Sequence, residues 1–280
     1  MALAMHPSRD QQPREDEPYD RWITESGVVT AEFHRDGDSG FLLRFPDHAD
    51  FQLDAETQAI ACHPAPGASA DHIAHLYANS VLPLIGNHRG ELNLHGSAVL
   101  CHGKAVAFLG RSGRGKTTLA GAFARAGQPF LAEDMVALRR EGSGYVVTPS
   151  QPVLRLFPDS AAHLLGDEMS GDLDDKRIVF ADEQLPHVVA TQDLSAVFVL
   201  GSGNSEGIAL GPLARAQAMA EIIQHAFILD VEDRPRLAAQ FARIGALAEG
   251  VSALSLDFPR RFDELPRVVE TVSAMVRRLA

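Results

Sequence analysis

The sequence predicts an α/β fold preceded by a small β-rich domain. Two short, wholly apolar runs, 105–109 and 196–200, are typical of strands buried on both faces of a sheet. The run 116–126 has helical periodicity and is followed by Gly127, a residue type that favours a helix C-terminus. Between residues 22 and 62, short alternating runs are separated by turn residues, which predicts a small antiparallel sheet.

The pattern along the chain predicts three parts. Residues 1–20 are rich in Pro, Gln, Asp and Arg, and we expect a disordered tail there. Residues 21–90 are predicted to form the β-rich domain, which includes a helix over 70–85. Residues 91–280 are predicted to form the α/β domain. Its further expected strands are 92–100, 130–132, 145–147, 153–156 and 251–258, and its further expected helices are 213–229, 234–248 and 263–279.

Composition excludes several classes of protein. The 280 residues carry 37 Asp and Glu against 25 Lys and Arg, a formal charge of −12, so broad binding to nucleic acid or to anionic membranes is not expected. Apolar residues make up 45 %, which excludes wholesale disorder. Two cysteines are too few for a disulfide framework or a structural zinc site. With no apolar run long enough to span a membrane, the expected location is the cytoplasm.

A glycine-rich segment after the first apolar run matches G-x-x-x-x-G-K-[ST], the pattern of a phosphate-binding loop. Glycines allow backbone N–H groups to surround phosphate oxygens, the lysine reaches the β and γ phosphates, and the threonine hydroxyl binds Mg²⁺. The helix that follows directs its positive end at the anion. The residues predicted to bind nucleotide are Gly110, Arg111, Ser112, Gly113, Arg114, Gly115, Lys116, Thr117 and Thr118.

An acidic pair follows the expected strand 130–132. Glu133 and Asp134 would lie at a strand end beside the loop, where a carboxylate can hold Mg²⁺ directly or through water. One of them could instead accept the proton of an attacking hydroxyl. The alternative interpretation is a solvated acidic turn.

Three other basic or imidazole side chains are candidates for the site. His95 precedes the loop by one strand and could meet a phosphate or the acceptor, although a single histidine is more often structural. Lys176 and Arg177 lie in a charged segment, 166–177, that could close over the γ-phosphate; Arg177 alone could supply the stabilising charge. The alternative is a solvated loop with internal charge pairing.

The stretch 94–138, LHGSAVLCHGKAVAFLGRSGRGKTTLAGAFARAGQPFLAEDMVAL, resembles the catalytic domain of bacterial HPr kinase/phosphorylase. The resemblance implies a core of the HPr kinase/phosphoenolpyruvate carboxykinase type. It implies that Lys116 binds the transferred phosphate, that Asp134 is the proton acceptor and that His95 belongs to the active site. It also implies Thr117, Glu133 and, by ungapped counting, Asp159 as metal ligands.

The resemblance fades after residue 138, because the segment around Asp159 lacks the family's Glu-Ile-Arg-Gly signature. Its loss removes the grounds for phosphorolysis and weakens HPr as the acceptor. The chain is more similar to the shorter kinases that phosphorylate a serine of lasso-peptide precursors. We therefore expect an ATP- and Mg²⁺-dependent serine kinase that acts on a protein or precursor peptide. A homo-oligomer is a further expectation. The alternatives are an HPr kinase, a small-molecule kinase and a non-catalytic, nucleotide-responsive binding module.

Overall fold

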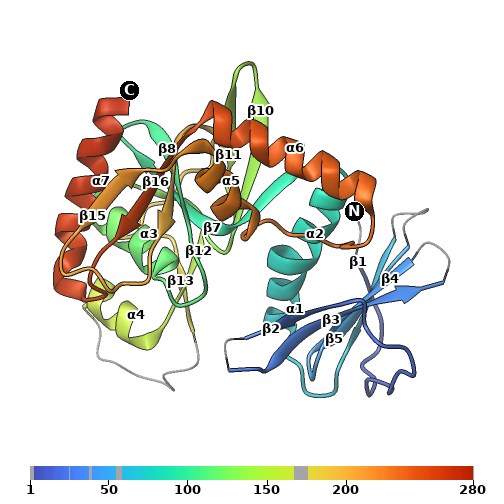
Figure 1. Cartoon of the computed structure of the whole chain (residues 1–280). Coiled ribbons are helices and arrows are strands. Elements are labelled where there is room, and N and C mark those ends of the chain that lie inside the picture. The colour runs from blue at the N-terminus through green and yellow to red at the C-terminus, as the bar shows by residue number, and fades with distance from the viewer. Residues whose placement is uncertain (1–2, 25, 38–39, 55–58, 167–175, 280) are drawn as a thin grey trace. The chain divides into compact units, whose positions relative to one another are not determined.

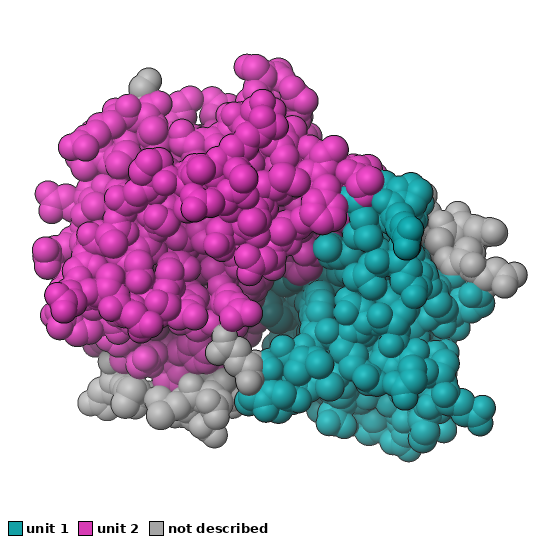
Figure 2. Space-filling view, in the orientation of Figure 1, with its two compact units in different colours: residues 1–88, 228–237 teal, residues 89–227, 238–280 magenta. Residues whose placement is uncertain are grey.

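The computed structural model describes residues 3–24, 26–37, 40–54, 59–166 and 176–279. The chain forms two compact units, coloured separately in Figure 2. Unit 1 contains residues 1–88 and 228–237, and unit 2 contains residues 89–227 and 238–280. Among the described residues, no helix is both long and apolar enough to cross a membrane.

Unit 1 is built on a six-stranded sheet whose strand order is β1-β6-β5-β4-β3-β2. All neighbours are antiparallel except β1 and β6, which are parallel. The short alternating runs predicted a small antiparallel sheet. Phe33, Leu43 and Phe51 are fully buried on it, and Phe41 and Leu42, next to Leu43, are buried as well, so burial does not alternate strictly along the strands. The strands are β1 (Leu3–Met5), β2 (Asp20–Ile23), β3 (Val29–Asp36), β4 (Gly40–Phe45), β5 (Ala49–Leu53) and β6 (Ile60–Pro64).

The helical part of unit 1 runs from residue 70 to residue 88, slightly beyond the predicted 70–85. It consists of α1 (Ala70–Leu76), a π-helical segment η1 (Tyr77–Val81) and α2 (Leu82–His88). Ser69 begins it, because its hydroxyl accepts the N–H of His72 at the helix start.

Two expectations about unit 1 were wrong. The expected tail, 1–20, is ordered where it is described: β1 pairs with β6, the Arg9 N–H donates to Pro64 O, and Gln11 bonds the Asp50 carboxylate. Sparse apolar content concealed these contacts because they are made mostly by the backbone. The unit also includes 228–237, a segment that sequence proximity assigns to the other domain.

Unit 2 contains a mixed sheet with the order β11-β10-β7-β8-β14-β16-β15. β8, β14 and β16 are parallel to one another, and β7 is antiparallel to β8. β11 also pairs with β14, and β9 pairs with β7. The strands are β7 (Leu92–Cys101), β8 (Lys104–Leu109), β9 (Phe130–Ala132), β10 (Met135–Glu141), β11 (Gly144–Thr148), β14 (Gln192–Leu200), β15 (Ala209–Pro212) and β16 (Ser252–Asp257).

A separate two-stranded sheet in unit 2 joins β12 (Val153–Leu156) to β13 (Arg177–Phe180). The helices are α3 (Lys116–Arg125), α4 (Pro158–Leu165), α5 (Arg215–Ile223), α6 (Arg234–Gly250), the 3₁₀ turn η2 (Phe262–Glu264) and α7 (Leu265–Leu279), most of them labelled in Figure 1. α5 ends six residues before its predicted end at 229. The chain turns there, where Ala226 bridges Leu94 of β7.

β8 lies at the centre of unit 2, as its wholly apolar sequence predicted. Val106 and Phe108 face a core that also contains residues of α3, α4 and α7, whereas Ala105, Ala107 and Leu109 face a second core. Because β8, β14 and β16 are parallel, the segments that follow them emerge at one edge of the sheet. That edge is where ligands bind in open α/β sheets.

Candidate active site

The loop between β8 and α3 is the glycine-rich segment 110–115. Gly115, at φ 83°, precedes the first residue of α3 in a left-handed conformation that glycine adopts without steric penalty. The Lys116 side chain folds back over the loop, and its Nζ donates to the carbonyl oxygens of Gly110 (2.8 Å) and Arg111 (3.2 Å). A phosphate at this loop would meet the N-terminus of α3 and a lysine already directed to the loop.

β7 brings His95 to the same edge of the sheet. Gly96 allows the close approach of β7 to β8, since a Cβ there would lie 2.7 Å from the carbonyl oxygen of Phe108. Burial, followed by the charge of the nearby Lys116, lowers the pKa of His95 to about 4. His95 is therefore neutral at neutral pH.

Glu133 and Asp134 leave β9 directly beside the loop. Thr117 Oγ1 donates to Glu133 Oε1 at 3.0 Å. Asp134 has φ 60°, a left-handed conformation uncommon outside glycine, and its carbonyl accepts the N–H of Gly96. Strained backbone of this kind is concentrated at functional sites.

The charges of this cluster are poorly compensated. Burial, followed by the neighbouring Asp134 carboxylate, raises the pKa of Glu133 to about 8. Burial also lowers the pKa of Lys116 to about 8. Perturbed groups at a strand edge of this kind are typical of catalytic or ligand-binding sites.

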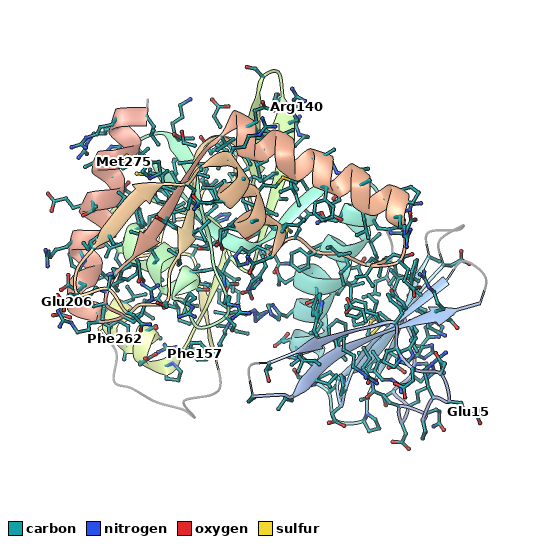
Figure 3. All side chains as sticks on the ribbon, viewed as in Figure 1. Glu15, Arg140, Phe157, Glu206, Phe262 and Met275 are labelled. Carbon is teal, nitrogen blue, oxygen red and sulfur yellow. The ribbon has the colours of Figure 1, made fainter. Side chains whose placement is uncertain are left out.

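His95, Lys116 and Asp134 border a cavity of about 450 Å³ in unit 2. Its aromatic wall includes Phe157 and Phe262, both labelled in Figure 3. The complete lining is His95, Ser112, Gly113, Gly115, Lys116, Thr117, Thr118, Asp134, Arg155, Leu156, Phe157, Asp159, Ser160, Lys176, Phe258, Arg260, Arg261, Phe262 and Leu265.

The loop that follows β14 is held beside the phosphate-binding loop by two arginines. Arg114 Nη1 donates to the carbonyl of Ser202 at 2.6 Å, and Arg260 Nη2 donates to that of Gly201 at 2.8 Å. Arg260 also stacks over the Phe258 ring, with 4.0 Å between the guanidinium carbon and the ring centroid. The segments after β8, β14 and β16 are thus tied together at one edge of the sheet.

Most of the residues predicted for the site lie on this cavity. The predicted residues on its lining are His95, Ser112, Gly113, Gly115, Lys116, Thr117, Thr118, Asp134 and Asp159. Glu133 lies behind Thr117, and Gly110 and Arg111 contact Lys116 through their carbonyls. Arg114 instead bonds the loop after β14.

Two predicted residues are placed less favourably. Arg177 begins β13, opposite Leu156, and is not part of the lining. Its neighbour Lys176 is, with Nζ 3.9 Å from Asp134 Oδ1. Asp159 is exposed, and its carboxylate accepts the N–H of Ser160. The rest of the expected charged loop, 167–175, lies outside the described residues.

Sequence reasoning missed two contributions to the site. The segment 258–265 supplies five lining residues, and only its position after a strand parallel to β8 could have indicated this. His225 is not among the predicted site residues; it is buried, and its carbonyl accepts the N–H of His95 at 2.7 Å. Burial, with Lys116 as the nearest charge, lowers the pKa of His225 to about 4.

A divalent cation could be held by Thr117 and Glu133. Adjacent oxygen ligands of an octahedral Mg²⁺ at about 2.1 Å lie about 2.9 Å apart, close to the 3.0 Å between these two oxygens. A buried carboxyl with a raised pKa would also gain from a cation. The described residues contain no cluster of three or more His, Cys, Asp or Glu suited to a metal, so phosphate and water would complete the coordination.

Comparison with known proteins shows a weak structural likeness and no match by sequence. No protein-family model matches the chain, and no curated protein matches it by sequence. Among solved structures, the chain is similar to an HPr(Ser) kinase/phosphatase from Coxiella burnetii, with a TM-score of 0.35 and 10 % identity over 66 % of this chain and 94 % of that one. The chain is a mixed α/β protein with this structural neighbour, and its activity has to be argued from the site itself.

Proposed function

We propose that the chain is an ATP-dependent phosphotransferase that phosphorylates a serine hydroxyl of a protein or peptide, and that the acceptor is a ribosomal precursor peptide. The observation that carries this proposal is one cavity lined by Lys116 and Thr117 of the phosphate-binding loop and by the Asp134 carboxylate. A nucleotide site needs the first two residues. A carboxylate facing them is what an attacking hydroxyl needs.

In the proposed reaction, the acceptor serine Oγ attacks the γ-phosphorus of ATP. The bond from that phosphorus to the oxygen it shares with the β-phosphate breaks, and ADP leaves with that oxygen. The proton of the serine hydroxyl passes to the Asp134 carboxylate. Lys116 Nζ moves from the carbonyls of Gly110 and Arg111 to the phosphates, where it offsets the negative charge.

Mg²⁺, held by Thr117 and Glu133, would neutralise charge on the phosphate oxygens. Binding a cation there favours loss of the Glu133 proton, which burial otherwise retains. His95, being neutral, hydrogen-bonds a phosphate or the acceptor without adding charge. The positive charge of Lys176 lies 3.9 Å from Asp134 Oδ1, beside the proposed proton acceptor.

The test is transfer from radiolabelled ATP, with Mg²⁺, to a panel of serine peptides, to HPr and to small hydroxyl compounds. Asp134→Asn keeps the shape of the side chain and removes the proton acceptor, so we expect nucleotide binding to persist and transfer to fall by at least about 100-fold. Asp193→Asn is the matched control, because Asp193 is 71 % exposed and pairs only with Lys104 among the contacts described.

Full transfer by Asp134→Asn would remove the proposed role of that residue. ADP release that no acceptor stimulates, with no labelled product, would favour a nucleotide-responsive binding module. Labelling of small compounds but of no peptide would favour a small-molecule kinase.

A further inference from the structure

The two-stranded sheet β12–β13 has one buried face and one exposed face. Leu154 and Leu156 of β12 point into the core, and Val179 of β13 packs against it. The other face carries Ile178 and Phe180, whose exposed fractions are 40 % and 70 %. Exposed apolar side chains on neighbouring alternate positions of one strand are unusual unless something covers them.

The outer edge of β13 is open as well. Ala181 N donates to Pro152 O, so this pair is hydrogen-bonded. Antiparallel pairs alternate between hydrogen-bonded and non-hydrogen-bonded, which makes Phe180 and Ile178 non-hydrogen-bonded partners of β12. Their N–H and C=O groups therefore point away from β12, and no described residue bonds to them.

The N-terminal end of β13 lies beside the cavity. Lys176, the residue before β13, lines the cavity and lies 3.9 Å from Asp134. Arg155 on the neighbouring strand β12, which is paired with Ile178, and Phe157, which follows that strand, line it too. At about 3.3 Å per residue, Ile178 and Phe180 lie roughly 7 and 13 Å along the strand from Lys176.

This sheet carries a local positive charge, whereas the chain as a whole is negatively charged. The segments 152–157 and 176–181 contain Arg155, Lys176 and Arg177 and no acidic residue, within a chain of net charge −12. The overall charge favours a basic or neutral acceptor. The sheet nearest the cavity instead favours an acidic one.

We propose that β13 is the docking strand for the acceptor, which binds as an extended segment along its open edge. This inference rests on the proposed phosphotransferase. The acceptor backbone pairs with the outward groups of Ile178 and Phe180, its apolar side chains cover those two residues, and an acidic side chain meets Arg155 or Lys176. With its serine at Asp134, the recognised residues lie about two to five positions from that serine.

The test uses the full chain and a decapeptide library with one fixed serine and degenerate flanks. We expect the library to select apolar and acidic residues within five positions of the serine. For a selected peptide, Phe180→Gln should raise KM about tenfold with kcat and ATP affinity unchanged. Phe241→Gln is the matched control, since Phe241 is a 44 % exposed phenylalanine on α6, remote in sequence from β13.

A second pair of variants tests the backbone. Ile178→Pro removes the outward N–H without removing a bond to β12, whereas Ile178→Ala shortens the side chain and keeps that N–H. We expect a larger rise in KM for proline than for alanine. Thermal melting of both variants shows whether the fold is retained.

Hydrogen exchange separates the two proposals. Slower exchange of the Ile178 and Phe180 amides on adding the peptide, without any phosphorylated product, would support docking and overturn the phosphotransferase. Phosphorylated peptides with the same KM for wild type, Phe180→Gln and Ile178→Pro would overturn docking and leave the phosphotransferase standing. Neither product nor protection would overturn both.

Discussion

Two charge clusters, one in each unit, differ in how completely their charges are paired. In unit 1, the Arg35 guanidinium donates to both Asp230 oxygens at 2.8 Å and to Glu232 at 2.9 Å. It also lies over the Tyr19 ring, 4.6 Å from its centroid. In unit 2, the hydrogen bonds that Lys116 makes to described residues go to the neutral carbonyls of Gly110 and Arg111, and Glu133 lies beside another carboxylate.

The pKa values record this difference. Burial alone would raise the pKa of Asp230, but the hydrogen bonds from Arg35 and from the backbone of Glu232 and Asp233 bring it below its ordinary value. At the cavity, burial prevails, raising the pKa of Glu133 and lowering that of Lys116. Removing one partner of a paired cluster leaves a buried charge uncompensated, which is costly, whereas charges that are already uncompensated are suited to a ligand that supplies the missing partners.

The largest expected effect is the loss of nucleotide binding in Lys116→Met. Removing a charge-assisted contact to phosphate should weaken ATP binding about 100-fold or more. Because burial lowers the pKa of the wild-type ammonium despite the charges of Asp134 and Glu133, we expect no fall in the melting temperature of the free protein. Titration with a fluorescent ATP analogue and thermal melting measure the two quantities. A variant that melts well below wild type would show that Lys116 is structural.

The next effect is a loss of stability in Arg35→Met. This change leaves the Asp230 carboxylate, 8 % exposed, with backbone donors only. The expected cost is about 2 kcal/mol, reduced from that of a fully buried pair because Arg35 is 42 % exposed. Urea unfolding measures it, and ATP binding should not change.

A matched surface pair provides the control for this prediction. Arg215 and Glu249 have the same bidentate geometry, at 2.8 and 3.0 Å, with both side chains about 60 % exposed. Arg215→Met should change stability by less than about 0.5 kcal/mol. Equal losses at Arg35 and Arg215 would contradict the importance of burial at the first pair.

A smaller effect concerns pH. The pKa of Glu133 is raised from 4.5 to about 8, so between these values the folded state binds a proton that the unfolded state has lost. Its contribution to stability is therefore complete below about pH 4.5 and is lost as pH rises through about 8. Glu133→Gln should have the same melting temperature as the wild type at pH 5. At pH 9 its melting temperature should be higher than that of the wild type by at least about 2–4 °C. The same difference in melting temperature between Glu133→Gln and the wild type at pH 5 and at pH 9 would contradict the raised pKa of Glu133.

The sequence could predict a charge cluster only where its residues lie close together along the chain. The loop 110–117, its flanking strand and helix, and the acid pair are contiguous patterns. Lys116, Thr117 and Asp134 line one cavity, and Glu133 bonds Thr117 beside it. Arg35 and Asp230 are 195 residues apart, and no local pattern links them. The same reason explains why 228–237 was assigned to the wrong part of the chain, and why β1 was interpreted as a tail.

Within the site, prediction failed where a shift of one residue in strand pairing decides which side chain reaches the cavity. Lys176 and Arg177 are adjacent, both basic and in the same charged segment. Only the pairing of Arg177 with Leu156 places one in β13 and leaves the other on the cavity. Phe258 and Arg260 depend on β16 being parallel to β14, a tertiary feature that hydrophobic patterning does not encode.

The smallest expected effect compares backbone strain in the two units. Asp134 at the site and Asp47 in a turn of unit 1 have nearly the same φ, 60° and 62°. At each position the glycine variant should be more stable than the alanine variant by about 1 kcal/mol, because only alanine is strained there. Comparing glycine with alanine cancels the loss of the carboxylate, and urea unfolding of the four variants measures both differences. A difference at Asp47 but none at Asp134 would contradict a left-handed conformation at the site. Equal differences would mean that the two units tolerate the same backbone strain, so that what distinguishes the site from the rest of the molecule is its uncompensated charge.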